Sequence, residues 1–115
     1  MKTPPILVGM FALAAILAPN FANATCATYV CWNEQIEMLY PNKSGPVYVT
    51  TTGNEGNLTQ CTPLSGKYFV MNMSDLGASA IYSTLLAAFH ADEDIRIVAV
   101  PGSNPCQISY VTVSN

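Results

Sequence analysis

The order of the secondary-structure patterns is the feature that most constrains the fold of this chain. Three strand-like runs come first, one helical run follows, and two further strand-like runs end the sequence, in the order β-β-β-α-β-β. The strand-like runs cover residues 29–40, 47–52, 67–72, 95–100 and 107–113. Each is rich in β-branched or aromatic residues and is bounded by turn-forming residues. This order predicts an α+β fold, a five-stranded Greek-key β-barrel with one helix.

The first 24 residues have the composition of a segment that is removed before folding. Lys2 lies in a short charged start, residues 6–18 carry no charge, and an A-x-A cleavage site ends at Ala24. These are the three parts of a secretory signal peptide. The uncharged run is shorter than the roughly 20 residues of a membrane-spanning helix, so a retained anchor is the less favoured alternative. We therefore predict a secreted or periplasmic protein with no membrane span and a single domain at residues 25–115.

The predicted domain contains four cysteines: Cys26, Cys31, Cys61 and Cys106. An exported protein with an even number of cysteines is expected to form disulfides. A zinc site is less favoured, because the sequence has no C-x-x-C pair and no histidine cluster. Of the three possible pairings we favour Cys61–Cys106, which would join two loops, with Cys26–Cys31 as the remaining pair. No metal and no cofactor are predicted.

Charged residues are scarce in the predicted domain. Its basic residues are Lys43, Lys67 and Arg96, against seven acidic residues, so its net charge is 3 − 7 = −4. With so little positive charge, the domain lacks the basic surface that binding to nucleic acid or to an anionic membrane requires. We therefore predict no nucleic-acid partner, and we interpret the low charge as a sign that a partner covers part of the surface.

The first strand-like run alternates between apolar and polar residues with one interruption. Its apolar face comprises Val30, Trp32, Ile36, Met38 and Tyr40. Glu34 falls on this face, and a β-bulge near Asn33 and Glu34 would explain its position. Two placements are open for Trp32: in the core with the rest of the apolar face, or at the surface as a platform for a ligand.

The helical run is expected to begin at a cap formed by Ser74 or Asp75 and to end near Ala91. At 3.6 residues per turn, its apolar residues form one broad stripe, which is expected to face the barrel. This stripe comprises Ala78, Ile81, Tyr82, Leu85, Leu86 and Phe89.

The opposite face of the helix is small and uncharged, since residues 76–91 contain no Lys, Arg, Asp or Glu. A face in water normally carries such charges, and small residues allow another backbone to come close. We interpret this face as a contact between the subunits of a homo-oligomer, with an ordinary uncharged surface as the alternative. The expected interface residues are Ser79, Ala80, Ser83, Thr84 and Ala87.

Catalytic patterns are weak in this sequence. His90 is the only histidine, and a serine–histidine pair would also need an orienting acid and an oxyanion hole. No glycine-rich phosphate loop and no G-x-S-x-G turn is present. We therefore predict a protein that is not an enzyme; the alternative is a small enzyme that uses His90 or the acidic run Asp92-Glu93-Asp94.

Tyrosine, asparagine, serine and threonine are frequent, and such residues suit neutral polar ligands such as sugars. The alternative is a β-protein whose tyrosines only fill strands. The candidate glycan-binding residues are Tyr29, Trp32 and Asn33, because aromatic rings can stack on a sugar while an amide bonds to its hydroxyl groups.

The sequence also resembles a known group of proteins. Its element order is that of the oligonucleotide/oligosaccharide-binding (OB) fold, and it is similar to the B subunits of bacterial A–B toxins of the subtilase-cytotoxin and typhoid-toxin type. The resemblance covers roughly residues 35–102, and small periplasmic proteins of unknown role share the pattern. It rests on short motifs: Val47-Tyr48-Val49, Cys61, Ser83-Thr84-Leu85, Ile95-Arg96-Ile97 and Pro101-Gly102.

This resemblance implies a carbohydrate-binding, receptor-binding subunit. It implies a ring of five copies with the helices lining a central pore, binding of sialylated cell-surface glycans on the outer barrel wall, and a possible catalytic A subunit. The family's glycan-contacting serine has no counterpart here, where the stretch reads Tyr29-Val30-Cys31-Trp32-Asn33. The alternative is a non-enzymatic periplasmic or secreted protein that binds a protein partner through its helix face.

Overall fold

The structure, a computed structural model, describes residues 24–114. The predicted signal peptide at residues 1–24 lies outside the described residues, apart from Ala24. Within the described range, no helix has the length and apolar character needed to cross a membrane.

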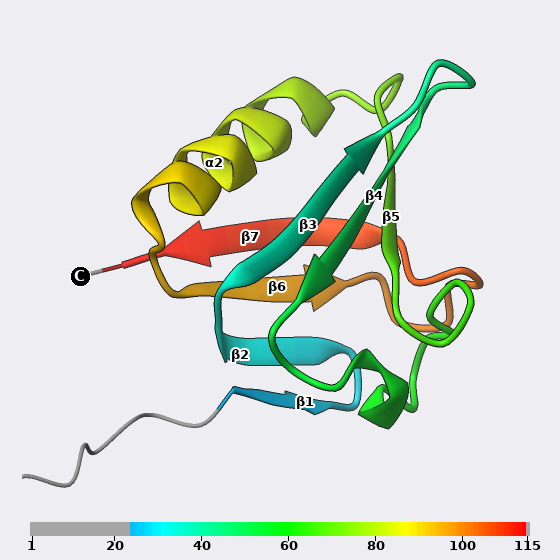
Figure 1. Cartoon of the computed structure of the whole chain (residues 1–115). Coiled ribbons are helices and arrows are strands. Elements are labelled where there is room, and N and C mark those ends of the chain that lie inside the picture. The colour runs from blue at the N-terminus through cyan, green and yellow to red at the C-terminus, as the bar shows by residue number, and fades with distance from the viewer. Residues whose placement is uncertain (1–23, 115) are drawn as a thin grey trace, which may run out of the picture.

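The domain consists of two antiparallel sheets and one α-helix (Figure 1). One sheet has four strands in the order β1-β2-β6-β7, namely β1 (Thr25–Ala27), β2 (Val30–Glu34), β6 (Ile95–Ala99) and β7 (Ile108–Val113). The other has three strands in the order β3-β4-β5, namely β3 (Ile36–Pro41), β4 (Pro46–Thr51) and β5 (Phe69–Asn72). A short 3-10 helix η1 (Glu55–Asn57) follows β4, and the helix α2 (Ala78–Ala91) lies between β5 and β6. The predicted mostly-β fold with one helix is confirmed.

The prediction of five strands in a closed barrel differs from the observed arrangement. The described residues form seven strands, and the two sheets do not close into one continuous barrel. The first predicted strand is divided at Gln35, whose backbone N–H donates to Thr52 Oγ1 (3.1 Å) and whose carbonyl accepts from Thr52 N (2.9 Å). β1 was not predicted, because a three-residue strand is too short to show an alternating pattern.

The two sheets meet at one isolated point between β5 and the start of β7. Val70 forms a parallel bridge with Gln107, and its N–H donates to Cys106 O at 2.8 Å. The Cys61–Cys106 disulfide lies at this same junction, and the second disulfide joins Cys26 of β1 to Cys31 of β2. Both predicted pairings are therefore confirmed.

The predicted β-bulge is also confirmed. The register between β2 and β6 shifts between Cys31 and Glu34, and Asn33 has a φ of 55°. The extra residue resets the alternation of the strand, so that Trp32 and Asn33 both reach the surface while Glu34 points inward. The predicted apolar face of the first run is accordingly wrong, because Trp32, Met38 and Tyr40 are exposed.

The core contains residues from both sheets and from α2, which Figure 1 shows across β7 and β3, away from β1. Its fully buried apolar side chains include Val49, Phe69, Met71, Leu85 and Ile97. The buried positions of α2 are Ala78, Leu85 and Ala88, with Ile81 packed beside them. The side chains that face the core are therefore spaced three, four and three residues apart along the helix, which places them on one side of it.

Two details of the helix prediction are wrong. Leu86 and Phe89 were expected in the core, but they are 39% and 38% exposed, because the buried stripe is centred on the alanine side of the helix. The helix also has no side-chain cap: Gly77 occupies the N-cap, and the N–H of Ala78 donates to the backbone carbonyl of Asp75. The end of the helix at Ala91 is as predicted.

Candidate functional site

A surface hollow of about 500 Å³ lies on the four-stranded sheet, between the bulge of β2, the start of β6 and the end of β7. We call it the Trp32 hollow. It is lined by Trp32, Asn33, Asp94, Ile95, Arg96, Thr112 and Ser114.

The bulge is the reason that β2 contributes two adjacent side chains to this hollow. In a regular strand, Trp32 and Asn33 would point to opposite faces. With Asn33 in the left-handed region, both are at the surface, and the Trp32 side chain is 36% exposed. The core placement that the sequence left open for Trp32 is therefore not observed.

The charged groups of the hollow come from the start of β6. Ile95 is buried, so Asp94 and Arg96 on either side of it point outward. Thr112 of β7 is the register partner of Arg96. Asp94 and Arg96 form no ion pair within 4.0 Å with each other or with other residues in the 24–114 range. An indole, an amide, a carboxylate, a guanidinium and a hydroxyl therefore border one hollow.

Tyr29, the third predicted glycan-binding residue, does not line this hollow. Its side chain is half-buried and packs against the core, and its carbonyl accepts from Ala99 N at 2.8 Å. The structure thus brings together Trp32 and Asn33 but not Tyr29. The other lining residues were not predicted, because they meet β2 only through the register of β6 and β7, which one sequence does not reveal.

Two buried carboxyl groups lie behind the bulge. Glu34 is 0% exposed and Glu55 is 4% exposed. Thr52 Oγ1 donates to Glu34 Oε1 at 3.3 Å, and Thr51 donates to Glu55 Oε2 through its N–H at 3.1 Å and also through its hydroxyl. Burial raises the pKa of Glu34 above its ordinary value of 4.5 and outweighs the hydrogen bonds that lower it. Burial also raises the pKa of Glu55, and the nearby charge of Glu34 adds to this effect.

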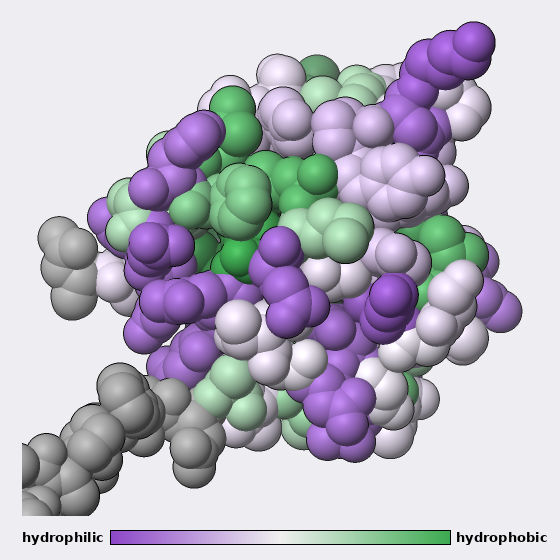
Figure 2. Space-filling view, in the orientation of Figure 1, coloured by the Kyte–Doolittle hydropathy of each residue, from purple (hydrophilic) through white to green (hydrophobic). Residues whose placement is uncertain are grey.

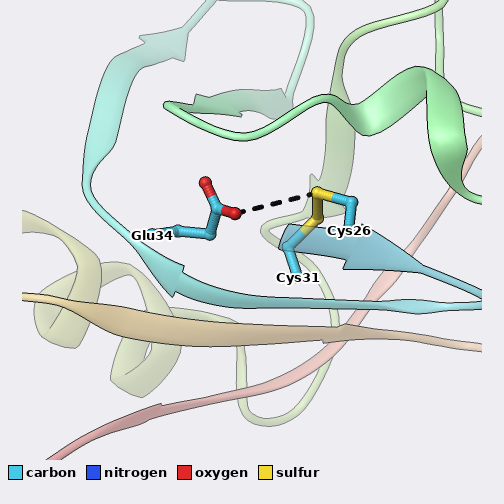
Figure 3. A group of neighbouring side chains, drawn as sticks. All are labelled: Cys26, Cys31 and Glu34. Atoms are coloured by element: carbon cyan, nitrogen blue, oxygen red, sulfur yellow. Dashed lines mark hydrogen bonds between the residues drawn. A yellow bond between two sulfur atoms is a disulfide. The ribbon is translucent and has the colours of Figure 1, made fainter. Parts of the chain in front are cut away.

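Figure 3 shows the Glu34 carboxyl directed at the Cys26–Cys31 disulfide, with Oε2 3.9 Å from Cys26 Sγ. These three residues place potential metal-binding atoms within 4.8 Å of one another. A metal needs cysteine thiolates, however, and both sulfurs are bonded to each other. The arrangement is therefore a disulfide packed against a carboxyl group.

The predicted interface residues of α2 all reach the surface, with Thr84 half-buried and the others exposed. The hydroxyls of Ser83 and Thr84 donate to the carbonyls of Ser79 and Ala80, each at 2.9 Å. Both hydroxyl hydrogens are therefore bonded within the helix, and this face has few donors left for water or a partner. Between it and the end of β7 lies a hollow of about 480 Å³, which we call the helix groove. The groove is lined by Ser83, Thr84, Ala87, Ala88, Ala91, Glu93 and Val113.

Three tyrosines, Tyr40 of β3, Tyr48 of β4 and Tyr68 directly before β5, form a cluster that was not predicted. Tyr40 and Tyr48 pack edge to face with ring centroids 5.3 Å apart, and Tyr68 lies 5.8 Å from Tyr48 and 6.5 Å from Tyr40. In Figure 2 the apolar colour gathers beside this region, where α2 adjoins β3. The exposed apolar residues of those two elements include Met38, Leu86 and Phe89.

The candidate catalytic residues are not assembled into a site. His90 is exposed on α2, and among the described residues no hydrogen bond joins it to a serine or an acid. Ser83 donates to a backbone carbonyl instead. Asp92, Glu93 and Asp94 follow the helix as a largely exposed turn, in which Asp92 is the left-handed C-cap.

These observations define a small mostly-β domain with one helix, two disulfides and an aromatic–polar surface hollow. Comparison with protein families, with curated proteins and with solved structures found no match to this chain. The assignment of a function therefore rests on the geometry and chemistry of the domain itself.

Proposed function

We propose that this protein is a non-enzymatic carbohydrate-binding domain and that its ligand site is the Trp32 hollow. The single observation that carries the proposal is the juxtaposition of an exposed indole with amide, carboxylate, guanidinium and hydroxyl groups in one hollow.

This set of groups suits the two surfaces of a sugar. The apolar C–H face of a pyranose ring can lie on the indole of Trp32, a large flat surface with only two side-chain torsions to be fixed on binding. Sugar hydroxyls both donate and accept, so Asp94 can accept from them while Arg96 donates. Hydrogen bonds to charged groups are about twice as strong as neutral ones. A ligand that presents one apolar face and several hydroxyls is therefore the best match.

We further propose that the fold is a variant of the OB fold. If the three-residue β1 is set aside and β2 and β3 are taken as one strand bent at Gln35, five strands remain in the order expected for that fold. The parallel bridge between Val70 and Gln107 supports this description, because it links the third and fifth of these strands. The similarity to toxin B subunits then makes a cell-surface glycan the natural ligand, and a catalytic A subunit a possible partner.

We also propose that the protein is secreted or periplasmic and forms a homo-oligomer, a pentamer by resemblance. Two disulfides are consistent with an oxidising compartment. The uncharged exposed residues on α2 support self-association, since no charge would have to be desolvated there.

The test is a glycan array followed by calorimetry with the best ligand. Trp32→Ala should lower the affinity at least about tenfold, as expected for the loss of a central aromatic contact. Tyr40→Ala is the matched control, because Tyr40 is an exposed aromatic residue of the other sheet and should leave binding unchanged. Binding that survives Trp32→Ala but is lost in Tyr40→Ala would move the site to the tyrosine cluster, and an array with no signal would remove the proposal.

A second candidate function is binding of a protein partner through α2. The helix groove favours it, because its walls are mostly small side chains that would admit a partner's side chain. Recovery of a defined partner whose binding is lost in Ser83→Glu but kept in Trp32→Ala would favour this function over carbohydrate binding.

A further inference from the structure

We propose that the buried Glu34 is the positioning residue of the Trp32 hollow and that its protonation couples the hollow to pH. The ligand-binding part of this inference rests on the proposed function, whereas the coupling itself does not.

Glu34 ties the bulge to two neighbouring segments. It directly follows Trp32 and Asn33, and its carboxyl reaches the disulfide of β1 on one side and the hydroxyl of Thr52 on the other. A Cβ atom at Gly53 would overlap this carboxyl, so the glycine leaves room for it. The two side chains that β2 gives to the hollow therefore depend on an anchor in the interior.

The surroundings of this anchor offer no compensating cation. From β1, Glu34 accepts a hydrogen bond from the backbone N–H of Thr25 and meets Cys26, which is in a disulfide. From β6 its register partner is the apolar Ile95. The end of β4 and the residues after it contribute Thr51, Thr52, Gly53 and Glu55, of which only Glu55 titrates. Asp94 and Arg96 flank Ile95 on the opposite, outward face. Lys43, Lys67 and Arg96 are all exposed.

The sign of the coupling follows from these contacts. A neutral Glu34 fits its buried position, whereas an ionised Glu34 lacks a cation, and the cost of burying its charge outweighs the hydrogen bonds that favour it. Because its pKa is raised, the folded domain keeps this proton to higher pH than the unfolded chain does. The stability contributed by the neutral group is thus full below the ordinary carboxyl range and is lost as pH rises through the raised pKa. Hydration of the ionised carboxyl would loosen the bulge, so the hollow is most ordered at acidic pH.

The first test needs no ligand, because Trp32 is the only tryptophan of the chain. Its fluorescence in the wild type should show a transition at a pH above the range in which an exposed carboxyl group titrates. Glu34→Gln should abolish this transition, and the matched control Glu37→Gln, an exposed acid on β3, should keep it. Asp94→Asn should also keep it, which excludes quenching by the acid within the hollow. A transition that persists unchanged in Glu34→Gln would overturn the proposal.

A second variant keeps the proposal falsifiable if Glu34→Gln does not fold. Thr52→Val removes a hydroxyl that donates to Glu34 Oε1 and favours its ionised form, so the Trp32 transition should move to higher pH. A midpoint that stays in place or falls would contradict the coupling.

Calorimetry with the best glycan separates this inference from the proposed function. Binding should weaken as pH rises in the wild type, and above the fluorescence transition Glu34→Gln should bind as tightly as the wild type binds below it. Glycan binding whose pH dependence is unchanged in Glu34→Gln would refute the coupling and leave the function standing. A fluorescence transition that depends on Glu34, without binding of any glycan, would refute the function and support the coupling.

Discussion

One residue, Asn33, decides which side chains of β2 reach the surface. Its left-handed backbone ends the simple alternation of the strand, so Trp32 and Asn33 point outward and Glu34 points inward. Asn tolerates this conformation better than most residues do. The sequence allowed the bulge to be predicted, because an acid interrupted an apolar face. It did not reveal that Trp32 would lie outside the core, because the buried face of β2 at this point is that of Cys31, and this depends on which face of the strand meets the other sheet.

At the same scale, we predict that Gly53→Ala destabilises the domain. The new methyl group would overlap the carboxyl of the buried Glu34, and overpacking of this kind costs about 1–3 kcal/mol. Urea denaturation measures the loss of unfolding free energy. Gly77→Ala is the matched control, because a Cβ at Gly77 would meet no atom within 4 Å, and its stability should be close to that of the wild type. Equal stabilities of the two variants would contradict the packing of Glu34.

At the scale of the element, the position of α2 in the sequence was easier to predict than its rotation about its own axis. The apolar period located the helix and its end at Ala91. The rotation was missed because Ala88 is as suitable for close packing as a larger residue, and hydropathy alone favoured Leu86 and Phe89. An alanine that faces the core lets the helix approach the sheets, and this preference depends on the shape of the opposing surface.

Also at this scale, Ser83→Glu should weaken self-association. If the exposed face of α2 packs against another copy, the substitution buries a charge without a partner, which costs about 3–5 kcal/mol and lowers the association constant at least about a hundredfold. Sedimentation velocity over a range of concentrations measures this change. Ser109→Glu, on an exposed position of β7, should sediment like the wild type. A wild type that is monomeric at tens of micromolar would exclude the oligomer altogether.

For the whole molecule, the sequence allowed the strands and the helix to be predicted. It did not show that the strands form two separate sheets instead of one closed barrel. The strand-like runs and both disulfide pairings were predicted from residue pattern and cysteine position. The division of the first run at Gln35 depends on hydrogen bonds to Thr52, which lies 17 residues away. The single bridge between β5 and β7 is a contact at still longer range. Such pairings are set by the packing of the two sheets, which local patterns do not encode.

We predict that the two disulfides contribute unequally to the stability of the domain. They join residues 45 and 5 positions apart, so loop-closure entropy gives about 4 kcal/mol for Cys61–Cys106 and about 2 kcal/mol for Cys26–Cys31. Each pair is replaced by two alanines, and unfolding in guanidinium chloride measures the difference. The two double variants control for each other, because each removes two sulfur atoms. A larger loss for the Cys26–Cys31 variant would show that packing around the Glu34 carboxyl outweighs chain entropy.

The absence of charge from α2 has a practical consequence for the assembled protein. Contacts between uncharged surfaces are hardly screened by dissolved ions, whereas an exposed carboxylate and guanidinium such as those of Asp94 and Arg96 are screened within about 10 Å at 0.1 M ionic strength. Rising ionic strength should therefore weaken ligand binding by the charged groups of the Trp32 hollow, while association through the helix persists. A single salt series on one preparation can in this way tell which of the two surfaces is in use.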